Sequence, residues 1–157
     1  MLPAKRYSWL LVLFFLPGCI VHGQEANLET LTIETSAGEA IHYQVEVARS
    51  QRERARGLMF REFMPEDHGM LFLYYPEKAA SMWMKNTIIS LDMLFIDKQG
   101  RIVRIVSDTE PGSTKTISSG EKVRAVLELN AGQALRRGIE PGAQVLHPTF
   151  KISSNEN

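Results

Sequence analysis

Alternation between apolar and polar residues is the main structural signal in the first part of the chain. Residues 31–35, Leu-Thr-Ile-Glu-Thr, and residues 41–47, Ile-His-Tyr-Gln-Val-Glu-Val, both alternate with a period of two. That period places one face of a strand in the protein interior and the other in water. Residues 36–39, Ser-Ala-Gly-Glu, supply turn-forming side chains between them. The pattern therefore predicts a β-hairpin.

Later segments are more continuously apolar and also predict strands. Residues 70–75, Met-Leu-Phe-Leu-Tyr-Tyr, form an unbroken apolar run, which we expect to be covered on both faces and to end at Pro76. Residues 81–85 and 88–97 predict two strands separated by a two-residue turn. Further strands are predicted at residues 101–107, 123–129 and 144–147.

Two capping-box patterns predict short helices. At residues 50–53, the Ser50 hydroxyl can accept an early helical N–H while the Glu53 carboxylate accepts the N–H of Ser50, which predicts a helix over 51–56 that ends at Gly57. Residues 130–133, Asn-Ala-Gly-Gln, predict a second helix that reaches Arg137. Many short strands with two short helices favour a mainly β fold, either an antiparallel β-sandwich or a partly open, jelly-roll-like barrel.

The first 23 residues predict a secretory signal sequence. Lys5 and Arg6 form a short basic region, and residues 9–16 form an apolar run of eight residues. Such a run is too short to cross a bilayer, which needs about 20 residues. A basic start followed by a short apolar segment and small residues is typical of a signal that is removed after export. We therefore expect a protein that crosses the bacterial inner membrane.

Two processing sites remain open. Residues 16–19, Leu-Pro-Gly-Cys, resemble a lipobox, in which Cys19 would be lipidated and would anchor the protein in the envelope. Cleavage after Gly23 would instead give a freely secreted, periplasmic protein. In either case residues 24–157 are expected to form one domain, with 24–30 as a tether and 151–157 as a loose tail.

Composition excludes several classes of protein. Cys19 is the only cysteine, so the mature domain has no internal disulfide and no thiolate for catalysis or metal binding. Removal of Lys5 and Arg6 with the signal leaves 16 basic and 18 acidic residues, a balance of −2. Such a balance gives no basic stripe for nucleic acid, so a nucleic-acid partner is not expected. The sequence leaves the oligomeric state open.

Four blocks of residues carry a recognisable sequence signature. The most specific is the third, Met-Trp-Met-Lys-Asn-Thr at residues 82–87 with Leu-Asp-Met-Leu-Phe-Ile-Asp at residues 91–97. The others are at residues 53–61, 69–72 and 126–142. Together they resemble the blocks of the DUF192 family, whose biochemical function is unknown. Ser90 and Ala143 depart from the family pattern, in which proline and an acidic residue are usual. The resemblance implies a jelly-roll-like β fold and no particular activity.

The third block also predicts a ligand-binding cleft. Trp83 suits stacking on a sugar face, and methionine suits surfaces that bind varied apolar ligands. Clefts of this kind are mostly apolar with a few convergent polar groups. The leading hypothesis is a module that binds a small molecule, a sugar or a peptide end, and the residues expected to line its cleft are Arg56, Leu58, Phe72, Met82, Trp83, Met84, Asn86, Thr87 and Asp92.

Carboxylates between apolar neighbours suggest an alternative, acid–base enzyme. Asp92 and Glu128 both lie inside apolar strands, where a carboxylate needs a partner or a shifted pKa. For Asp92 the expected partners are Arg56, Arg61 or Lys85. Convergence of Asp92 with Glu128 or Glu53 on one pocket would permit hydrolysis or isomerisation.

Two other functions stay open. Met82 and Met84, with His68, could carry copper(I) through soft sulfur ligands, and an envelope assembly protein would need no small ligand. The chain has no phosphate loop, no dinucleotide fingerprint and no histidine pair at zinc-binding spacing. We therefore expect no cofactor.

Overall fold

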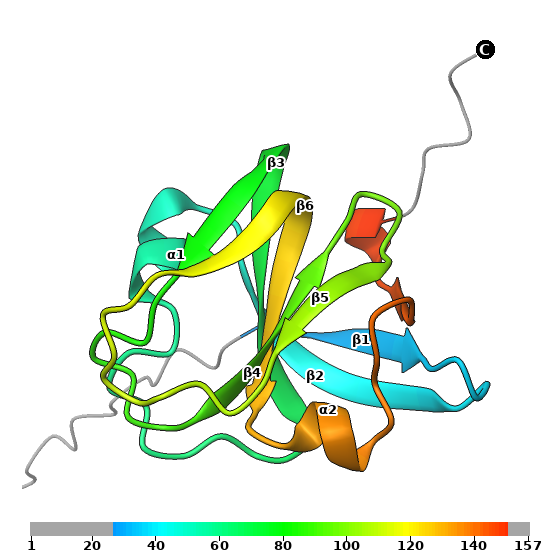
Figure 1. The fold of residues 1–157 in the computed structure, drawn as a ribbon, viewed down its shortest axis with the longest axis horizontal. Coiled ribbons are helices and arrows are strands. Elements are labelled where there is room, and N and C mark those ends of the chain that lie inside the picture. Colours follow the sequence, from blue (N-terminus) through cyan, green and yellow to red (C-terminus); the bar gives the residue numbers. More distant parts are fainter. Residues whose placement is uncertain (1–26, 151–157) are drawn as a thin grey trace, which may run out of the picture.

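The computed structural model describes residues 27–150, which form one curled sheet of seven strands with two short helices (Figure 1). The strand order is β5-β4-β6-β3-β2-β1-β7, and the curled sheet makes a half-barrel. The strands are β1 (Leu28–Glu34), β2 (Ala40–Ala48), β3 (His68–Met82), β4 (Leu91–Ile96), β5 (Ile102–Val106), β6 (Ile117–Asn130) and β7 (Gln144–Leu146). The helices are α1 (Gln51–Arg56), α2 (Gln133–Arg136) and the 3-10 turn η1 (Pro148–Phe150).

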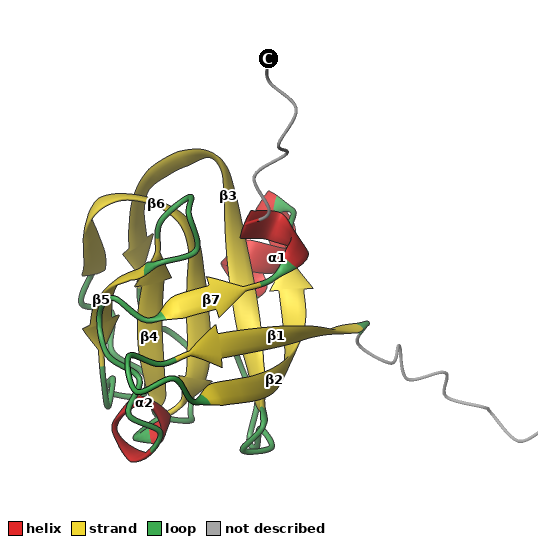
Figure 2. Ribbon diagram, turned by 90° about the vertical axis from the view of Figure 1, so that its right-hand side faces the viewer, coloured by secondary structure: helices red, strands yellow, loops and turns green. Residues whose placement is uncertain are grey.

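Backbone pairing explains why the sheet curls toward closure. Neighbouring strands are antiparallel except for β2 and β3, which are parallel because α1 and the loop after it connect them. Figure 2 shows β7 beside β1 at one edge of the sheet. An antiparallel bridge between Arg101 and Gln144 joins this edge to the start of β5, where the Val145 N–H donates to the Gly100 carbonyl at 2.7 Å. The mainly β, partly open barrel expected from the sequence is therefore confirmed.

The sheet buries apolar side chains on both faces. Leu127 and Leu129 of β6 point into the half-barrel, while Val126 of the same strand packs in a second cluster on the outer face. Phe72 and Tyr74 of β3 belong to the outer cluster, which Leu58, from the loop after α1, helps to cover. Burial on both faces accounts for the continuous apolar runs in the sequence. It also places Glu128, two residues after Val126, on the outer face.

The structure corrects several boundaries. The strand that begins at His68 does not end at Pro76 but runs on to Met82. The pairing of β3 with β6 is interrupted between Leu73 and Lys78 and resumes where Lys78 pairs with Val123. A proline inside this irregularity removes no ladder hydrogen bond. Residues 83–85 are consequently not a strand, and the strand expected over 88–97 is limited to β4. β1 begins at Leu28, so residues 28–30 belong to the sheet and not to a tether.

The two helix predictions had different outcomes. The capping box of α1 is present as expected, with both the Ser50 and Glu53 hydrogen bonds formed. The second capping box is absent: the residue before α2 is Gly132, with a φ of 78° and no side-chain cap. The Asn130 amide instead donates to the carbonyls of Met64 and Pro65, at 2.9 and 3.0 Å. The Asn130 side chain therefore makes a tertiary contact and does not cap α2, although the local pattern predicts such a cap.

The predicted signal sequence with Cys19, the predicted cleavage position after Gly23 and the predicted tail over 151–157 lie outside the described residues. Within residues 27–150, no helix is long and apolar enough to cross a membrane.

Gly69 allows β3 and β6 to approach closely beside Glu128, and its replacement by alanine is expected to destabilise the fold. A Cβ at this position would lie 2.7 Å from the Glu128 carbonyl oxygen and 2.8 Å from Leu129 Cδ2. Because the first contact is with backbone, the two strands would have to separate, at a cost of about 2 kcal/mol. Urea unfolding of Gly69→Ala measures this loss. A variant as stable as the wild type would show that the sheet absorbs the added methyl group.

Candidate functional site

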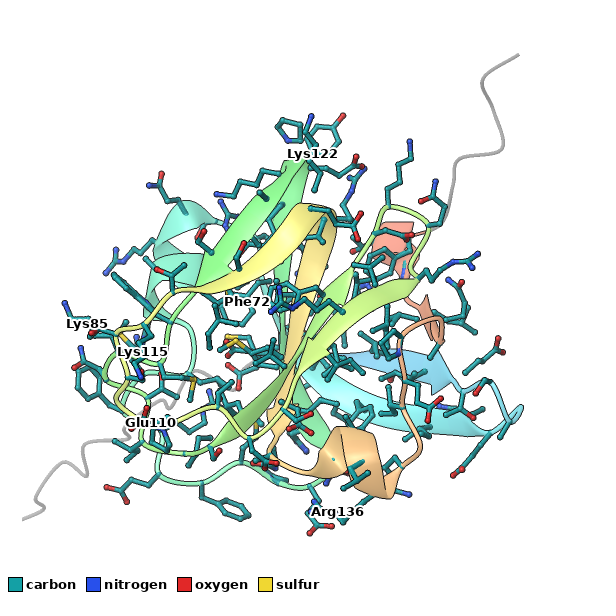
Figure 3. The ribbon with its side chains drawn as sticks, viewed as in Figure 1. Phe72, Lys85, Glu110, Lys115, Lys122 and Arg136 are labelled. Atoms are coloured by element: carbon teal, nitrogen blue, oxygen red, sulfur yellow. The ribbon has the colours of Figure 1, made fainter. Side chains whose placement is uncertain are left out.

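A cavity of about 450 Å³ lies on the outer face of the sheet, between α1 and the long strands β3 and β6. Figure 3 places Phe72 in this region, beside α1. Both apolar and polar groups line it. The lining residues are Gln51, Arg54, Ala55, Arg56, Gly57, Leu58, Met59, Phe72, Tyr74, Lys78, Ser81, Met82, Trp83, Thr87 and Glu128.

Helix α1 is fixed over the sheet by its cap and by one arginine. The Ser50 hydroxyl accepts the N–H of Glu53 at 3.1 Å, and the Glu53 carboxylate accepts the N–H of Ser50 at 2.7 Å. Arg54 donates to the carbonyl of Leu73 at 3.0 Å. These hydrogen bonds hold the helix against β3 and bring Arg54 to the cavity.

Gly57 ends α1 and permits close packing at the cavity wall. Its φ is 47°, and a Cβ there would lie 3.2 Å from Cζ of Phe72. A left-handed φ and this close approach both favour glycine. The chain can therefore turn directly over the Phe72 ring and bring Leu58 to the cavity wall.

Among residues 27–150, Glu128 is the only acidic residue that lines the cavity. It is 4% exposed, and its neighbours across the two adjacent strands are Met70 and Met93. Within residues 27–150, no hydrogen bond or ion pair reaches its carboxyl group. Burial raises the pKa of Glu128 to about 8, because water no longer solvates the ionised form. At neutral pH this group is mainly a neutral acid that can donate a hydrogen bond.

Tyr74 lies beside Glu128 and carries two cations over its ring. The Arg54 guanidinium is 5.4 Å and the Lys78 ammonium 4.9 Å from the ring centroid. Its hydroxyl donates to the sulfur of Met82 at 3.3 Å. Burial raises the pKa of Tyr74, while the Arg54 charge opposes this shift. The ring therefore places two positive charges at the cavity.

The Met-Trp-Met block is split between the cavity and the interior. Trp83 lines the cavity and is 51% exposed, with the Lys85 ammonium 5.5 Å from its ring centroid. Met82 also lines the cavity, whereas Met84 is fully buried and accepts a hydrogen bond from the hydroxyl of Thr109. Because β3 ends at Met82, the two methionines do not share a strand face.

Most of the other residues expected at the cleft line the cavity. Arg56, Leu58, Phe72 and Thr87 line the cavity. Asn86 does not: its φ is 58°, in a turn that the Thr87 N–H closes by donating to the Met84 carbonyl at 2.9 Å. The Asn86 carbonyl accepts the N–H of Phe60 at 2.8 Å.

Asp92 lies away from the cavity and has structural partners. It is fully buried, and its carboxylate accepts the N–H groups of Asp108, Gly132 and Ala134 at 3.1, 3.1 and 2.8 Å. These backbone donors replace the arginine or lysine partners expected from the sequence; Arg61 is paired with Glu46. Asp92 therefore caps α2.

The three carboxylates proposed for acid–base chemistry do not converge. Glu53 caps α1, Asp92 caps α2, and of the three only Glu128 lines the cavity.

The residues proposed for copper(I) binding contact other groups of the chain. His68 contacts Asp67 at 2.8 Å. Over the described range 27–150, no group of three His, Cys, Asp or Glu residues is arranged to hold a metal ion.

Arg54, Tyr74 and Lys78 were missed by the sequence analysis. A signal existed for Tyr74, since it is two residues from Phe72 and shares its strand face. Arg54 could have been identified as a cation within the capped helix. Lys78 had no signal, because its position depends on the interruption of the β3–β6 pairing.

Two solved structures share this fold. One is a Sinorhizobium meliloti protein provisionally described as a transcription regulator, with a TM-score of 0.75 and 42% identity over 76% of this chain and 92% of that chain. The other is a Novosphingobium aromaticivorans protein of unknown function, with a TM-score of 0.74 and 35% identity over 76% of this chain and 85% of that chain. No curated protein matches the chain. Residues 32–147 match the family described as DUF192, "Uncharacterized ACR", and the chain therefore belongs to the DUF192 family.

Proposed function

We propose that this protein is an extracytoplasmic binding module, which takes a small ligand into the cavity between α1, β3 and β6. One observation carries the proposal: a cavity of about 450 Å³ contains a buried carboxyl group, Glu128, to which no described residue offers a hydrogen bond. In residues 27–150 the fully enclosed side-chain atoms without a hydrogen bond are Arg124 Nε and His147 Nε2. The Glu128 oxygens are not among them, so the carboxyl group opens onto the cavity, where a ligand can complete its hydrogen bonds.

The cavity has the size and the lining of a small-molecule site. Its volume lies within the range of about 300 to 1,000 Å³ that is usual for ligand pockets. Phe72, Met82 and Trp83 supply apolar and aromatic walls, and the half-exposed Trp83 ring provides a platform for a sugar or another flat group.

Replacement of Trp83 by alanine is expected to abolish ligand binding without unfolding the protein. A ligand that binds the native state raises its melting temperature by mass action. We expect a sugar, amino acid, peptide or cell-wall fragment to raise the melting temperature of the wild type and not of Trp83→Ala. A thermal-shift screen measures both.

Phe63→Ala is the matched control for this experiment, since Phe63 is also an exposed aromatic residue, at 74%, but does not line the cavity. This variant should keep the ligand-induced shift. An equal shift in wild type and Trp83→Ala would count against the proposed site. Inclusion of copper(I) in the screen tests the carrier function, and a shift with copper(I) alone would favour it.

A second candidate is an acid–base enzyme that uses Glu128. A carboxyl group with a pKa near 8 can donate and accept a proton at neutral pH, and this observation favours the candidate. Asp92 and Glu53 serve as helix caps, so Glu128 would act without a second carboxylate. An enzyme would convert a bound ligand to a product, and Glu128→Gln would lose this conversion. A binding module would release the ligand unchanged.

A further inference from the structure

We infer that the ligand is a small hydroxylated organic anion of the sugar-acid class, whose carboxylate lies among Arg54, Arg56 and Lys78 and whose hydroxyl oxygen accepts a hydrogen bond from Glu128. The inference rests on the proposed binding function and names the chemistry of its ligand.

The charge of the cavity lining favours an anion. Among residues 27–150, three cations and one acid line the cavity, and the acid is buried. Within residues 27–150, Arg54, Arg56 and Lys78 make no ion pair with a carboxylate, whereas Arg61 and Arg124 are each paired. Partly or fully exposed cations around a concave apolar surface attract an anionic ligand.

A second, smaller cavity shows that this charge is not general over the surface. It has a volume of about 300 Å³. Its charged lining residues are Glu29, Glu46, Arg49 and Glu53, so acids outnumber cations there. The excess of cations is therefore a feature of the cavity that contains Trp83 and Glu128 and not of the second cavity.

The position of Glu128 specifies a ligand with an acceptor oxygen. Glu128 is enclosed by Met70 and Met93 across the neighbouring strands, and an ionised carboxylate without a partner is costly in such surroundings. The neutral acid instead has an O–H to donate. A hydroxyl or carbonyl oxygen of the ligand would complete this hydrogen bond.

Trp83 supplies an aromatic platform for a cyclic body of the ligand. The Lys85 ammonium lies over its ring, and the ring also lines the cavity. Sugar rings present an apolar face that stacks on an aromatic ring. A pyranose with a carboxylate therefore matches the three parts of the site: cations, aromatic platform and buried donor.

Binding of this anion should require the protonated form of Glu128. The charged or titratable groups that share the cavity with it are Arg54 and Arg56 from α1, and Tyr74 and Lys78 from β3, while β4 contributes the neutral Met93. Burial raises the pKa of Tyr74 above its ordinary value of 10.0, so its hydroxyl group stays neutral near pH 8. Glu128 is thus the group that changes charge near pH 8. Its deprotonation would remove the donor and repel the anion.

Calorimetric titration with glucuronate and glucose tests the inference, because these ligands differ in the carboxylate. Glucuronate is expected to bind at least about tenfold more tightly than glucose at pH 6.5, as for one added charge-assisted contact. Its affinity for the wild type should fall about thirtyfold by pH 9.5, because a group with a pKa of about 8 is then largely deprotonated. Glu128→Gln, which keeps a donor at every pH, should retain its affinity for glucuronate at pH 9.5.

Lys78→Met and Lys122→Met form a matched pair of variants. Both lysines are exposed on the paired strands β3 and β6, where Lys78 pairs with Val123 and Ala79 with Lys122, but Lys122 does not line the cavity. Figure 3 shows Lys122 at the tip of this pair of strands. Lys78→Met should weaken glucuronate binding about tenfold and leave glucose binding unchanged, while Lys122→Met should bind both as the wild type does.

Each contrary outcome has a separate meaning. Equal affinity for glucose and glucuronate, or an equal loss of affinity at pH 9.5 in wild type and Glu128→Gln, would overturn the inference and leave the binding function in place. Tighter binding of glucose 6-phosphate than of glucuronate would overturn the inference that the anionic group of the ligand is a carboxylate. Absence of binding by all three ligands would overturn the inference, and the broader screen with Trp83→Ala would then decide whether the binding function also fails.

Discussion

Replacement of Asp92 by asparagine is expected to destabilise the fold by about 3 kcal/mol or more, although Asp92 lies outside the proposed site. One carboxylate oxygen accepts the N–H groups of Asp108 and Gly132, and the other accepts that of Ala134. In either orientation, the asparagine NH₂ group would face a backbone donor. Since the site is fully buried, no water can separate the two donors. Urea unfolding of Asp92→Asn measures the loss.

Asp97→Asn is the matched control. Asp97 also accepts two backbone N–H groups, those of Gln99 and Arg101 at 2.9 Å each, but in a turn that water reaches. We expect this variant to lose less than about 1 kcal/mol, because both N–H groups bond to the same oxygen, Oδ1, which asparagine keeps, and its NH₂ group faces no backbone donor. Similar losses in the two variants would show that the donors around both Asp92 oxygens do not govern the cost of the Asp92 change.

The Asp92 hydrogen bonds explain how one buried charge is tolerated in the interior. They join β4 to the first turn of α2 and to the chain at Asp108, whose φ is 51°. Backbone donors offset the loss of hydration of the carboxylate. Asp92 therefore organises the end of the barrel that holds α2, and its role in the third sequence block is structural.

Replacement of Glu128 by glutamine is expected to stabilise the protein in alkaline solution and to have little effect in acid. Burial raises the pKa of Glu128 from 4.5 to about 8 in the folded state. Between these values the unfolded chain loses the proton and the folded protein keeps it, so stability falls as pH rises from about 4.5 to about 8. This pKa shift corresponds to a loss on the order of 5 kcal/mol in the free energy of unfolding. A glutamine at position 128 does not ionise and would not cause this loss.

Urea unfolding at pH 4.5 and pH 9 measures this difference. Glu128→Gln should gain several kcal/mol over the wild type at pH 9 and should be close to it at pH 4.5. Glu121→Gln is the control, since Glu121 lies exposed on the same strand, β6, and this change should have a small effect at both pH values. A constant difference between Glu128→Gln and wild type would show that the Glu128 carboxyl is as well solvated in the folded protein as in the unfolded chain.

A buried carboxyl group that lowers stability at neutral pH is consistent with a functional role. Residues that cost stability without a structural partner concentrate at sites where a protein binds or reacts. Asp92 and Glu128 are both buried acids in apolar strands, yet three backbone donors surround the first and a cavity adjoins the second. The two stability predictions therefore separate a structural carboxylate from a functional one.

The local parts of the fold followed from the sequence alone. Strict alternation defined the β1–β2 hairpin, and the spacing of Ser50 and Glu53 defined α1, because these signals depend on neighbours within four residues. Apolar runs and short turns were enough to predict a mainly β fold. The cavity residues Arg56, Leu58, Phe72, Met82, Trp83 and Thr87 were also chosen from the sequence.

The tertiary structure decided which groups meet. Asp92 is 40 and 42 residues from the two amides at the start of α2, and no local pattern connects such distant positions. The sequence placed Asp92 and Glu128 in the same class, since both are acids between apolar residues. Pairing of β3, β4 and β6 then turned one acid toward backbone donors and the other toward a cavity. Side-chain periodicity is a property of each strand, but the partner across the sheet is fixed only when the whole chain packs.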